Sequence, residues 1–270
     1  MRRALYPLLE REFTYAEYDA FLGRLAAAPV RVVPVAELDE APAEETGVLA
    51  LRHDVDERLD SALRLAQLEH DHGLRATYYV LHTARYWEDE GLIASLQRLH
   101  SLGHEVGWHN DLVTMWITTG ADPRAYLTGE LARLREAAIA VTGVASHGAA
   151  LCYRLGYHNN AFFSDFDDEE RPAFPNSDSV DTGRGRLPIP KGRLADFGLE
   201  YEAYHLDYDL YYSDTYVGTS RWHPAELNLG EVGAGHKAVV LIHPCHWDEG
   251  VVAKMRRFGR DLAAGKWRGS

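Results

Sequence analysis

Residues 49–56 read Leu-Ala-Leu-Arg-His-Asp-Val-Asp, an apolar run that ends in a histidine and two carboxylates. An acidic, breaker-rich segment precedes this run, and a helical pattern with apolar residues on one face follows it. This is the pattern of a buried strand that runs into a helix, with charged groups at the strand's carboxyl end. Open α/β sheets and barrels place their chemistry at that end.

Asp54 and Asp56 are two residues apart on an extended backbone, so both side chains would point to the same side. Two carboxylates that converge there repel each other unless a cation or a proton lies between them. The simpler alternative is that one carboxylate caps the helix and the other is solvated. For His-Asp-x-Asp on an apolar strand, we favour a functional site.

Strand-like and helical segments alternate along the first half of the chain. Thr14 and Glu17 form a capping-box pattern, Gly73 and Gly103 follow helical segments, and Asp122 precedes a proline at a helix start. The predicted strands are 49–53, 76–81, 105–108 and 141–147, and the predicted helices are 14–28, 59–72, 92–103 and 122–138. This alternation indicates a parallel α/β sheet or barrel. The length of 270 residues fits one large α/β domain.

The rhythm of elements is lost over residues 151–197, which we interpret as an irregular insertion of long loops over a site rather than a second domain. Strand-like runs return at 199–205, 210–212 and 238–243, and a closing helix is predicted at 251–263. The predicted organisation is an N-terminal helical and extended extension, residues 1–47, packed on a barrel that spans residues 48–270.

Composition excludes several classes of partner. The chain has 28 Lys and Arg against 41 Asp and Glu, a net charge of −13, which argues against a nucleic-acid-binding or anionic-membrane surface. Charged residues at 10–12 interrupt any apolar signal segment, and no stretch is long enough to span a bilayer. We therefore expect a cytoplasmic protein whose partner is a small molecule, with no nucleic acid and no membrane.

Histidines recur at the ends of the predicted strands. His147 and His243 end such strands, His109 directly follows one, and Asp111 lies two residues after His109. In a parallel barrel these ends gather at one rim. A single histidine at such a position is usually structural, but several of them beside carboxylates are better explained by a metal site. This donor set suits zinc or another divalent first-row metal such as cobalt, nickel or iron.

Three motifs resemble the polysaccharide deacetylase superfamily, also called the NodB-homology superfamily or carbohydrate esterase family 4. They are Arg-His-Asp-Val-Asp at 52–56, Gly-Leu-Arg-Ala-Thr-Tyr-Tyr-Val at 73–80 and Gly-His-Glu-Val-Gly-Trp-His at 103–109. Leu-Ile-His-Pro at 241–244 resembles the last motif of the family. The resemblance implies a distorted (β/α)7-type barrel in a single domain. It also implies metal-dependent hydrolysis of an N-acetyl or related C–N bond.

The resemblance also assigns roles to individual residues. Asp54 corresponds to the catalytic base, Asp56 to the metal-binding aspartate, His109 to the first histidine of the family's His-x-x-x-His pair and His243 to the catalytic acid. The second histidine of that pair would fall at Val113, which cannot bind a metal. His147 is the preferred third ligand, because it ends a neighbouring strand, and Asp111 is the alternative. If neither fits, the chain is a weakened or metal-free relative.

The arginine-containing motif that the family carries after its fourth strand is absent; Ser-His-Gly stands there at 146–148. The residue that orients Asp54 is therefore Arg52, Arg154 or Arg221, and the residues alone do not select one. Four further residues are candidates for contact with the substrate: Asp111, Asp214, Trp222 and His246. The segments around Asp214 and Trp222 could instead hold His243 or form a structural turn. His53 and His104 should face away from this site and be structural.

The function predicted from the sequence is metal-dependent hydrolysis of an amide C–N bond. The simplest form is N-deacetylation of a small sugar, nucleoside or amino-sugar conjugate. One alternative is ring opening of a cyclic amide or imide at the same site. The other is a metal-free, non-catalytic relative.

Overall fold

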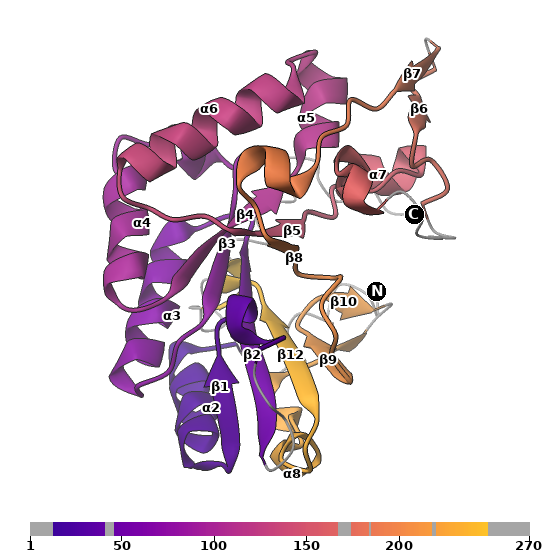
Figure 1. Cartoon of the computed structure of the whole chain (residues 1–270). Coiled ribbons are helices and arrows are strands. Elements are labelled where there is room, and N and C mark those ends of the chain that lie inside the picture. Colours follow the sequence, from indigo (N-terminus) through magenta and orange to yellow (C-terminus); the bar gives the residue numbers. More distant parts are fainter. Residues whose placement is uncertain (1–12, 41–45, 167–173, 184, 218–219, 248–270) are drawn as a thin grey trace, which may run out of the picture.

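A single curled sheet of parallel strands organises the protein (Figure 1). The computed structural model describes residues 13–40, 46–166, 174–183, 185–217 and 220–247. In order of pairing, the strands are β8 (Tyr201–Glu202), β5 (Gly143–Ser146), β4 (Glu105–Asn110), β3 (Thr77–Leu81), β2 (Gly47–Val55), β12 (Lys237–Ile242) and β9 (Leu210–Ser213). An eighth strand, β1 (Val30–Val33), pairs with the first residues of β2. The fold is thus a distorted (β/α)7-type barrel in a single domain, as the sequence predicts.

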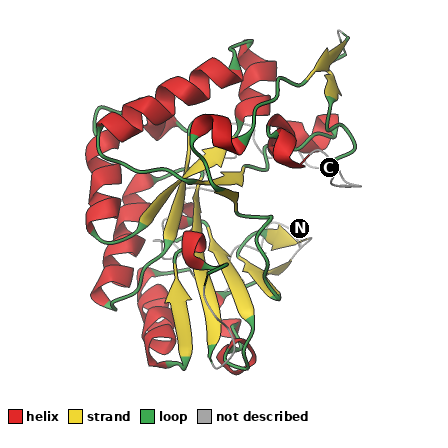
Figure 2. Cartoon of the chain, in the orientation of Figure 1, coloured by secondary structure: helices red, strands yellow, loops and turns green. Residues whose placement is uncertain are grey.

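Helices cover the outer face of this sheet (Figure 2). The longer ones are α2 (Tyr15–Ala27), α3 (Leu59–Asp71), α4 (Leu92–Ser101) and α6 (Pro123–Glu136). Local signals set their ends: the Thr14 hydroxyl accepts from the backbone N–H of Glu17, and the Asp122 side chain caps α6 ahead of Pro123. These four helices were predicted at nearly the same boundaries.

Helix α5 (Leu112–Thr119) was not predicted from the sequence. The backbone N–H of Leu112 donates to the side chain of Asn110 at 3.1 Å, but those of Val113 and Thr114 are satisfied from far along the chain, by the side-chain oxygen of Asn159 at 3.1 and 3.2 Å. Contacts supplied 46 and 45 residues away leave no local sequence signal.

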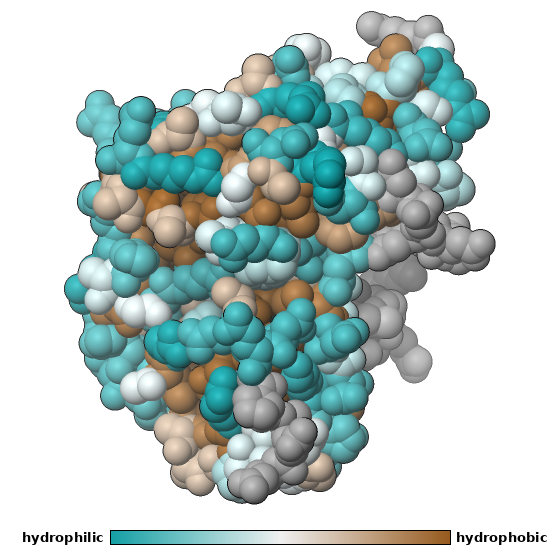
Figure 3. Space-filling view, in the orientation of Figure 1, coloured by the Kyte–Doolittle hydropathy of each residue, from teal (hydrophilic) through white to brown (hydrophobic). Residues whose placement is uncertain are grey.

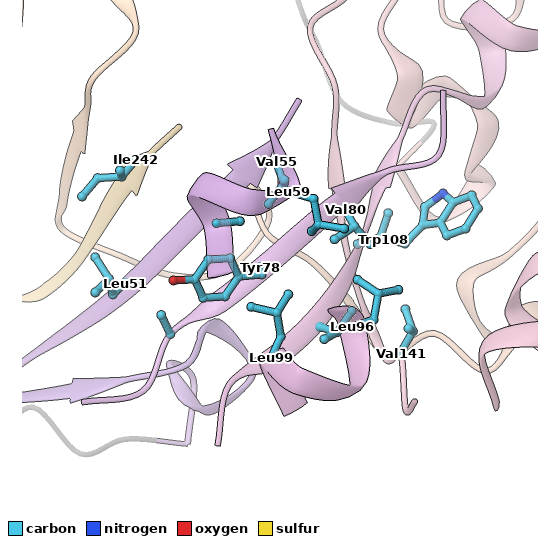
Figure 4. Packing of buried hydrophobic residues seen from close by; sticks show 14 of the residues in the cluster. Leu51, Val55, Leu59, Tyr78, Val80, Leu96, Leu99, Trp108, Val141 and Ile242 are labelled. Atoms are coloured by element: carbon cyan, nitrogen blue, oxygen red, sulfur yellow. The ribbon is translucent and has the colours of Figure 1, made fainter. Parts of the chain in front are cut away.

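The outer face of the sheet and the helices form the main hydrophobic core (Figure 4). Leu51 and Val55 of β2 and Tyr78 and Val80 of β3 are buried there, against leucines of α3 and α4 such as Leu59, Leu96 and Leu99. Residues two apart along each strand share this face, so the residues between them point to the inner face. On β2, the inner residues include both Arg52 and Asp54.

A second, smaller hydrophobic cluster, which contains Tyr79 with Tyr201 packed against it, lies on the inner side of the sheet. A Cβ atom on Gly107 would lie 2.3 Å from the ring of Tyr79, and one on Gly143 would lie 2.2 Å from the hydroxyl of Tyr201, so glycine is needed at both positions. The two hydroxyls are 2.9 Å apart, and Tyr201 donates to Glu105 at 2.5 Å. The polar groups at the carboxyl ends of the strands lie above this packed layer.

The insertion predicted at residues 151–197 is irregular. It contains helix α7 (Ala150–Leu155), short 3-10 turns and a two-stranded hairpin of β6 (Ser179–Asp181) and β7 (Arg186–Pro188). The hairpin extends away from the barrel in Figure 1. Hydrophilic residues dominate the face drawn in Figure 3, with hydrophobic residues exposed between them.

The C-terminal half adds the remaining strands of the sheet. The predicted strand at 199–205 is reduced to β8, while the predicted strands at 210–212 and 238–243 are present as β9 and β12. Shorter elements follow β9: the pair β10 (Tyr216–Val217) and β11 (Ser220–Arg221), and helix α8 (Leu229–Val232). The predicted closing helix at 251–263 lies outside the described residues. No described helix is long and apolar enough to cross a membrane.

Candidate metal centre and active site

Asp56, His109 and His147 come together at the carboxyl ends of three strands. Asp56 follows β2, His109 lies near the end of β4, and His147 follows β5. The Oδ1 atom of Asp56 is 3.2 Å from Nε2 of His109 and 3.3 Å from Nδ1 of His147. One potential ligand atom from each residue lies within 4.8 Å of the others. The parallel register, which pairs His109 with Ala145, brings the strand ends to one rim.

The hydrogen bonding of this cluster fits a cation. Nδ1 of His109 lies 2.8 Å from the backbone carbonyl of Ala145 and must donate to it, so Nε2 is the nitrogen that can offer a lone pair, and it faces Asp56. The buried Oδ1 of Asp56 has no hydrogen-bond partner of suitable geometry among the described residues. Lone pairs that face each other require a cation or a proton between them. A histidine that donates its second nitrogen to a carbonyl is typical of metal ligands.

Electrostatics support the same interpretation. Burial alone would raise the pKa of Asp56, but His109 and His147 hold it well below its ordinary value. Burial would lower the pKa of His147, but the carboxylate of Asp56 raises it. The cluster therefore attracts positive charge, as a proton or as a divalent ion with one oxygen and two nitrogen ligands.

Asp54 lies beside this cluster, with Oδ2 3.6 Å from Nε2 of His109. Arg52 of the same strand holds its carboxylate with two hydrogen bonds of 2.8 Å, from Nε to Oδ1 and from Nη2 to Oδ2. Both side chains are buried. Burial would raise the pKa of Asp54, but Arg52 and His109 lower it, so the carboxyl is ionised at neutral pH.

This pairing distinguishes the three arginines considered from the sequence. Arg52 orients Asp54 and is too deeply buried to present a free surface to substrate. Arg154 lies exposed on α7. Arg221 lies in β11, but its side chain is outside what the structure describes.

A second cluster is formed by Asp214, His243 and His246. Nδ1 of His243 donates to Oδ1 of Asp214 at 2.5 Å, while Oδ2 accepts from the backbone N–H of His243 and from Nδ1 of His246, both at 3.0 Å. Both carboxylate oxygens thus have hydrogen-bond donors, unlike Oδ1 of Asp56. This cluster is explained as a hydrogen-bonded group without a cation.

Asp214 controls the charge of His243. Burial would lower the pKa of His243, but the buried carboxylate of Asp214 raises it to about 9. The pairing of β12 with β2 aligns Ile242 with His53. His243 is therefore placed close enough to Asp54 and Asp56 for their charges to raise its pKa further.

The other candidates lie around these groups. Asp111 is not part of the metal-ligand cluster, since its carboxylate accepts from Thr83 at 2.8 Å and from Asn159 at 2.9 Å. Trp222 packs on the ring of Tyr212, with ring centroids 5.3 Å apart. The side chain of Asn159 also donates to the backbone carbonyl of His147 at 2.9 Å. The sequence marks Asn159 only as a residue of the irregular segment that could line a pocket; its contacts with His147 and α5 were not predicted, because an asparagine in an irregular segment has no distinguishing local pattern.

His53 and His104 lie on the outer face, away from these groups, as predicted. Nε2 of His53 is 2.6 Å from the buried carboxylate of Glu69, which also accepts from Tyr18 and Tyr78. Nδ1 of His104 accepts from a backbone N–H, and its Nε2 donates to a carbonyl. Both histidines are thus bound within the core.

Comparisons with known proteins give matches in structure alone. No family model matches the sequence, and no curated protein is similar to it in sequence. A CE4 esterase from Streptococcus mutans matches with a TM-score of 0.40 and 14% identity, over 78% of this chain and 77% of that chain. A family 4 carbohydrate esterase from Bacillus anthracis matches with a TM-score of 0.37 and 12% identity, over 94% and 88%.

The structure also shows where this chain differs from the motifs that it resembles. Val113, where the family pattern would have its second histidine, is buried in the hydrophobic core on α5. His147 of the next strand along the sheet stands beside Asp56 and His109 instead. One carboxylate and two imidazoles are thus brought together without a histidine at position 113.

Proposed function

We propose that this protein is a metal-dependent hydrolase of amide C–N bonds, most simply an N-deacetylase of a small sugar, nucleoside or amino-sugar conjugate. One observation carries the proposal. A three-ligand cluster, Asp56 with His109 and His147, lies beside a carboxylate held by Arg52 and near an imidazole held by Asp214. A Lewis acid, a base and an acid at one rim are the groups that amide hydrolysis requires.

Asp56, His109 and His147 would hold the metal. A metal bound there would lower the pKa of water and polarise the acyl carbonyl. Asp54 would take the proton from the attacking water, while Arg52 keeps its carboxylate in one orientation. His243 would then give its Nε2 proton to the amine nitrogen as the C–N bond breaks. Asp214 holds that imidazole through Nδ1, so that Nε2 is the atom left to transfer a proton.

The protonation states support this division of roles. The pKa of Asp54 is lowered, so it is an ionised base at neutral pH, while the pKa of His243 is raised to about 9, so it is a protonated acid there. Titratable neighbours whose pKa values are pushed apart are typical of acid–base pairs in enzymes.

Aromatic side chains near His147 support a substrate that contains a ring. Tyr153 is 68% exposed, and its hydroxyl would lie 3.3 Å from a Cβ atom on Gly148. Its ring is 5.2 Å from that of Phe174, which is 5.2 Å from the ring of His158. Such rings can stack on the apolar face of a sugar or a base. The net charge of −13 supports a neutral or cationic substrate.

The test measures the release of acetate from a panel of N-acetylated sugars, amino-sugar conjugates and nucleosides. The protein should be stripped of metal and reconstituted in turn with zinc, cobalt, nickel or iron, and we propose that zinc is the metal. We also propose that the protein is located in the cytoplasm. Acetate release that requires the added metal is the expected result. Ring opening of cyclic amides or imides without acetate release would replace the deacetylase assignment. Metal content below about a tenth of an equivalent, with no activity on reconstitution, would favour a non-catalytic relative.

A further inference from the structure

Arg52 is held on one side by hydrogen bonds and elsewhere by aromatic rings. Its Nε and Nη2 atoms are committed to Asp54, whereas the buried Nη1 atom has no hydrogen-bond partner among the described residues. The ring of Tyr204 lies 4.2 Å from the guanidinium carbon, and the ring of Tyr79 lies 5.3 Å from it. Hydrogen bonds fix the edge that faces Asp54, so contacts with the rings must restrain the remainder of the guanidinium.

Tyr204 belongs to the segment that connects the two ends of the sheet. Residues 203–209 run from β8, which pairs with β5, to β9, which pairs with β12. This connection crosses the barrel between its two edge strands and carries Tyr204 to the interior side of β2. Tyr79 comes from β3 and is part of the sheet itself, so only Tyr204 depends on how this segment is held.

Glu202 fixes the position of Tyr204. Its buried carboxylate accepts from the backbone N–H of Tyr204 at 2.8 Å and from the backbone N–H of Ser146 at 3.0 Å. The backbone of Ala203 also donates to Val144 at 2.8 Å. The segment is therefore anchored to β5, the strand that leads to His147.

We propose that Tyr204 is a positioning residue for the reaction: its ring clamps Arg52 so that the guanidinium holds Asp54 in the orientation of a base. The proposal rests on the proposed function for its kinetic consequence, but its structural consequence does not. A cation over a tyrosine ring is stabilised more when the groups are shielded from water; here Arg52 is fully buried and Tyr204 is partly buried. Without the ring, the unpaired Nη1 would allow the guanidinium to rotate toward other acceptors.

The kinetic test compares Tyr204→Leu, Tyr204→Phe and Tyr208→Leu. Leucine at position 204 removes the ring face, and phenylalanine keeps it. Tyr208→Leu is the matched control, because Tyr208 lies in the same 203–209 segment but its ring packs on Tyr211 of β9. We expect Tyr204→Leu to lower kcat about 5- to 30-fold with KM within about twofold, and the other two variants to stay within about twofold. In an Arg52→Lys background, which loses the two-pronged contact, Tyr204→Leu should have no further effect on kcat.

A second measurement does not depend on activity. In 15N-labelled protein, the Nε–H signal of Arg52, assigned by its loss in Arg52→Lys, should exchange slowly with solvent in the wild type and in Tyr204→Phe. It should exchange faster or broaden in Tyr204→Leu. If Tyr204→Leu does not fold, as judged by circular dichroism, Tyr204→Met takes its place.

Wild-type kcat and an unchanged Arg52 signal in the Tyr204→Leu protein would overturn the proposal. Equal losses in Tyr204→Leu and Tyr208→Leu would also overturn it, since they would indicate a general loosening of the segment. If the wild type hydrolyses no substrate, the proposed function fails, and the Arg52 signal alone then decides whether the clamp exists.

Discussion

The imidazole of His147 lies 3.3 Å from the carboxylate of Asp56, although β3 and β4 run between the strands that carry them. Neighbouring strands are about 4.8 Å apart, so a flat sheet would separate these two residues by about 14 Å. The curl of the barrel and the length of the two side chains remove that distance. The third position of the proposed metal centre therefore depends on the curvature of the sheet.

Replacing His147 tests this position directly. We expect His147→Ala to weaken zinc binding more than about 100-fold, because losing even an outer partner of a metal ligand costs about 10- to 100-fold. Asp111→Asn is the matched variant, since Asp111 is the alternative ligand but is bound to Thr83 and Asn159. Its zinc affinity should match the wild type in a chelator competition. A loss in Asp111→Asn and none in His147→Ala would reverse the assignment.

Asp54 should be required for turnover but not for the metal. We expect Asp54→Asn to lower kcat about 100- to 10,000-fold, the range that a general base provides, while the metal content stays at the wild-type value. Asp60→Asn removes an exposed carboxylate near the start of α3 and should leave both unchanged. Steady-state kinetics together with elemental analysis of the same samples make the comparison. A full rate in Asp54→Asn would remove Asp54 from the mechanism.

The pH dependence of kcat should report His243. The acid form is the active one, and its pKa is raised to about 9, so we expect the rate to fall as the pH rises through about 9. Asp214→Asn removes the carboxylate that contributes most to raising this pKa, so burial then lowers it against the charges of Asp54 and Asp56 alone. The alkaline limb of the profile should move to lower pH in this variant. An alkaline limb at the same pH in both proteins would show that another group is responsible.

The outer-face network around Glu69 should matter for stability rather than for catalysis. Tyr78 donates to the buried carboxylate at 2.7 Å, so Tyr78→Phe should reduce the free energy of unfolding by about 1.5–3 kcal/mol, measured in urea. Tyr15→Phe, which loses a longer and less buried contact of 3.4 Å, should cost less than about 0.5 kcal/mol. Activity per folded molecule should be unchanged in both.

The same network has a defined pH dependence. Burial would raise the pKa of Glu69, but His53 and the hydrogen bonds lower it, so the folded state favours the ionised form. Its contribution to stability is then fully present above the unfolded pKa of about 4.3 and is lost as the pH falls through the lowered folded value. The stability difference between wild type and Glu69→Gln should therefore shrink in acid. A difference that is constant with pH would contradict this account.

Much of the fold is predictable because its signals are local. The capping box of Thr14 and Glu17, the glycines after α3 and α4 and the apolar run of β2 lie within a few residues of the structure that they specify. Helix α5 shows the opposite case. The side chain of Asn159 accepts from the backbone N–H groups of Val113 and Thr114 in its first turn, and a side chain that arrives from 46 residues away cannot be read from the helix sequence.

The sequence by itself determined the alternation of strands and helices, and it placed Asp54, Asp56 and His109 at the ends of strands. It could do so because apolar periodicity and the succession of segments along the chain are properties of neighbouring residues. Only the tertiary structure decided that His147 rather than Asp111 stands beside Asp56, that Arg52 rather than Arg154 holds Asp54, and that Asp214 holds His243. Each of these choices is a contact of a few ångströms between side chains. Such contacts depend on the register, curl and packing of the whole sheet, which no short stretch of sequence contains.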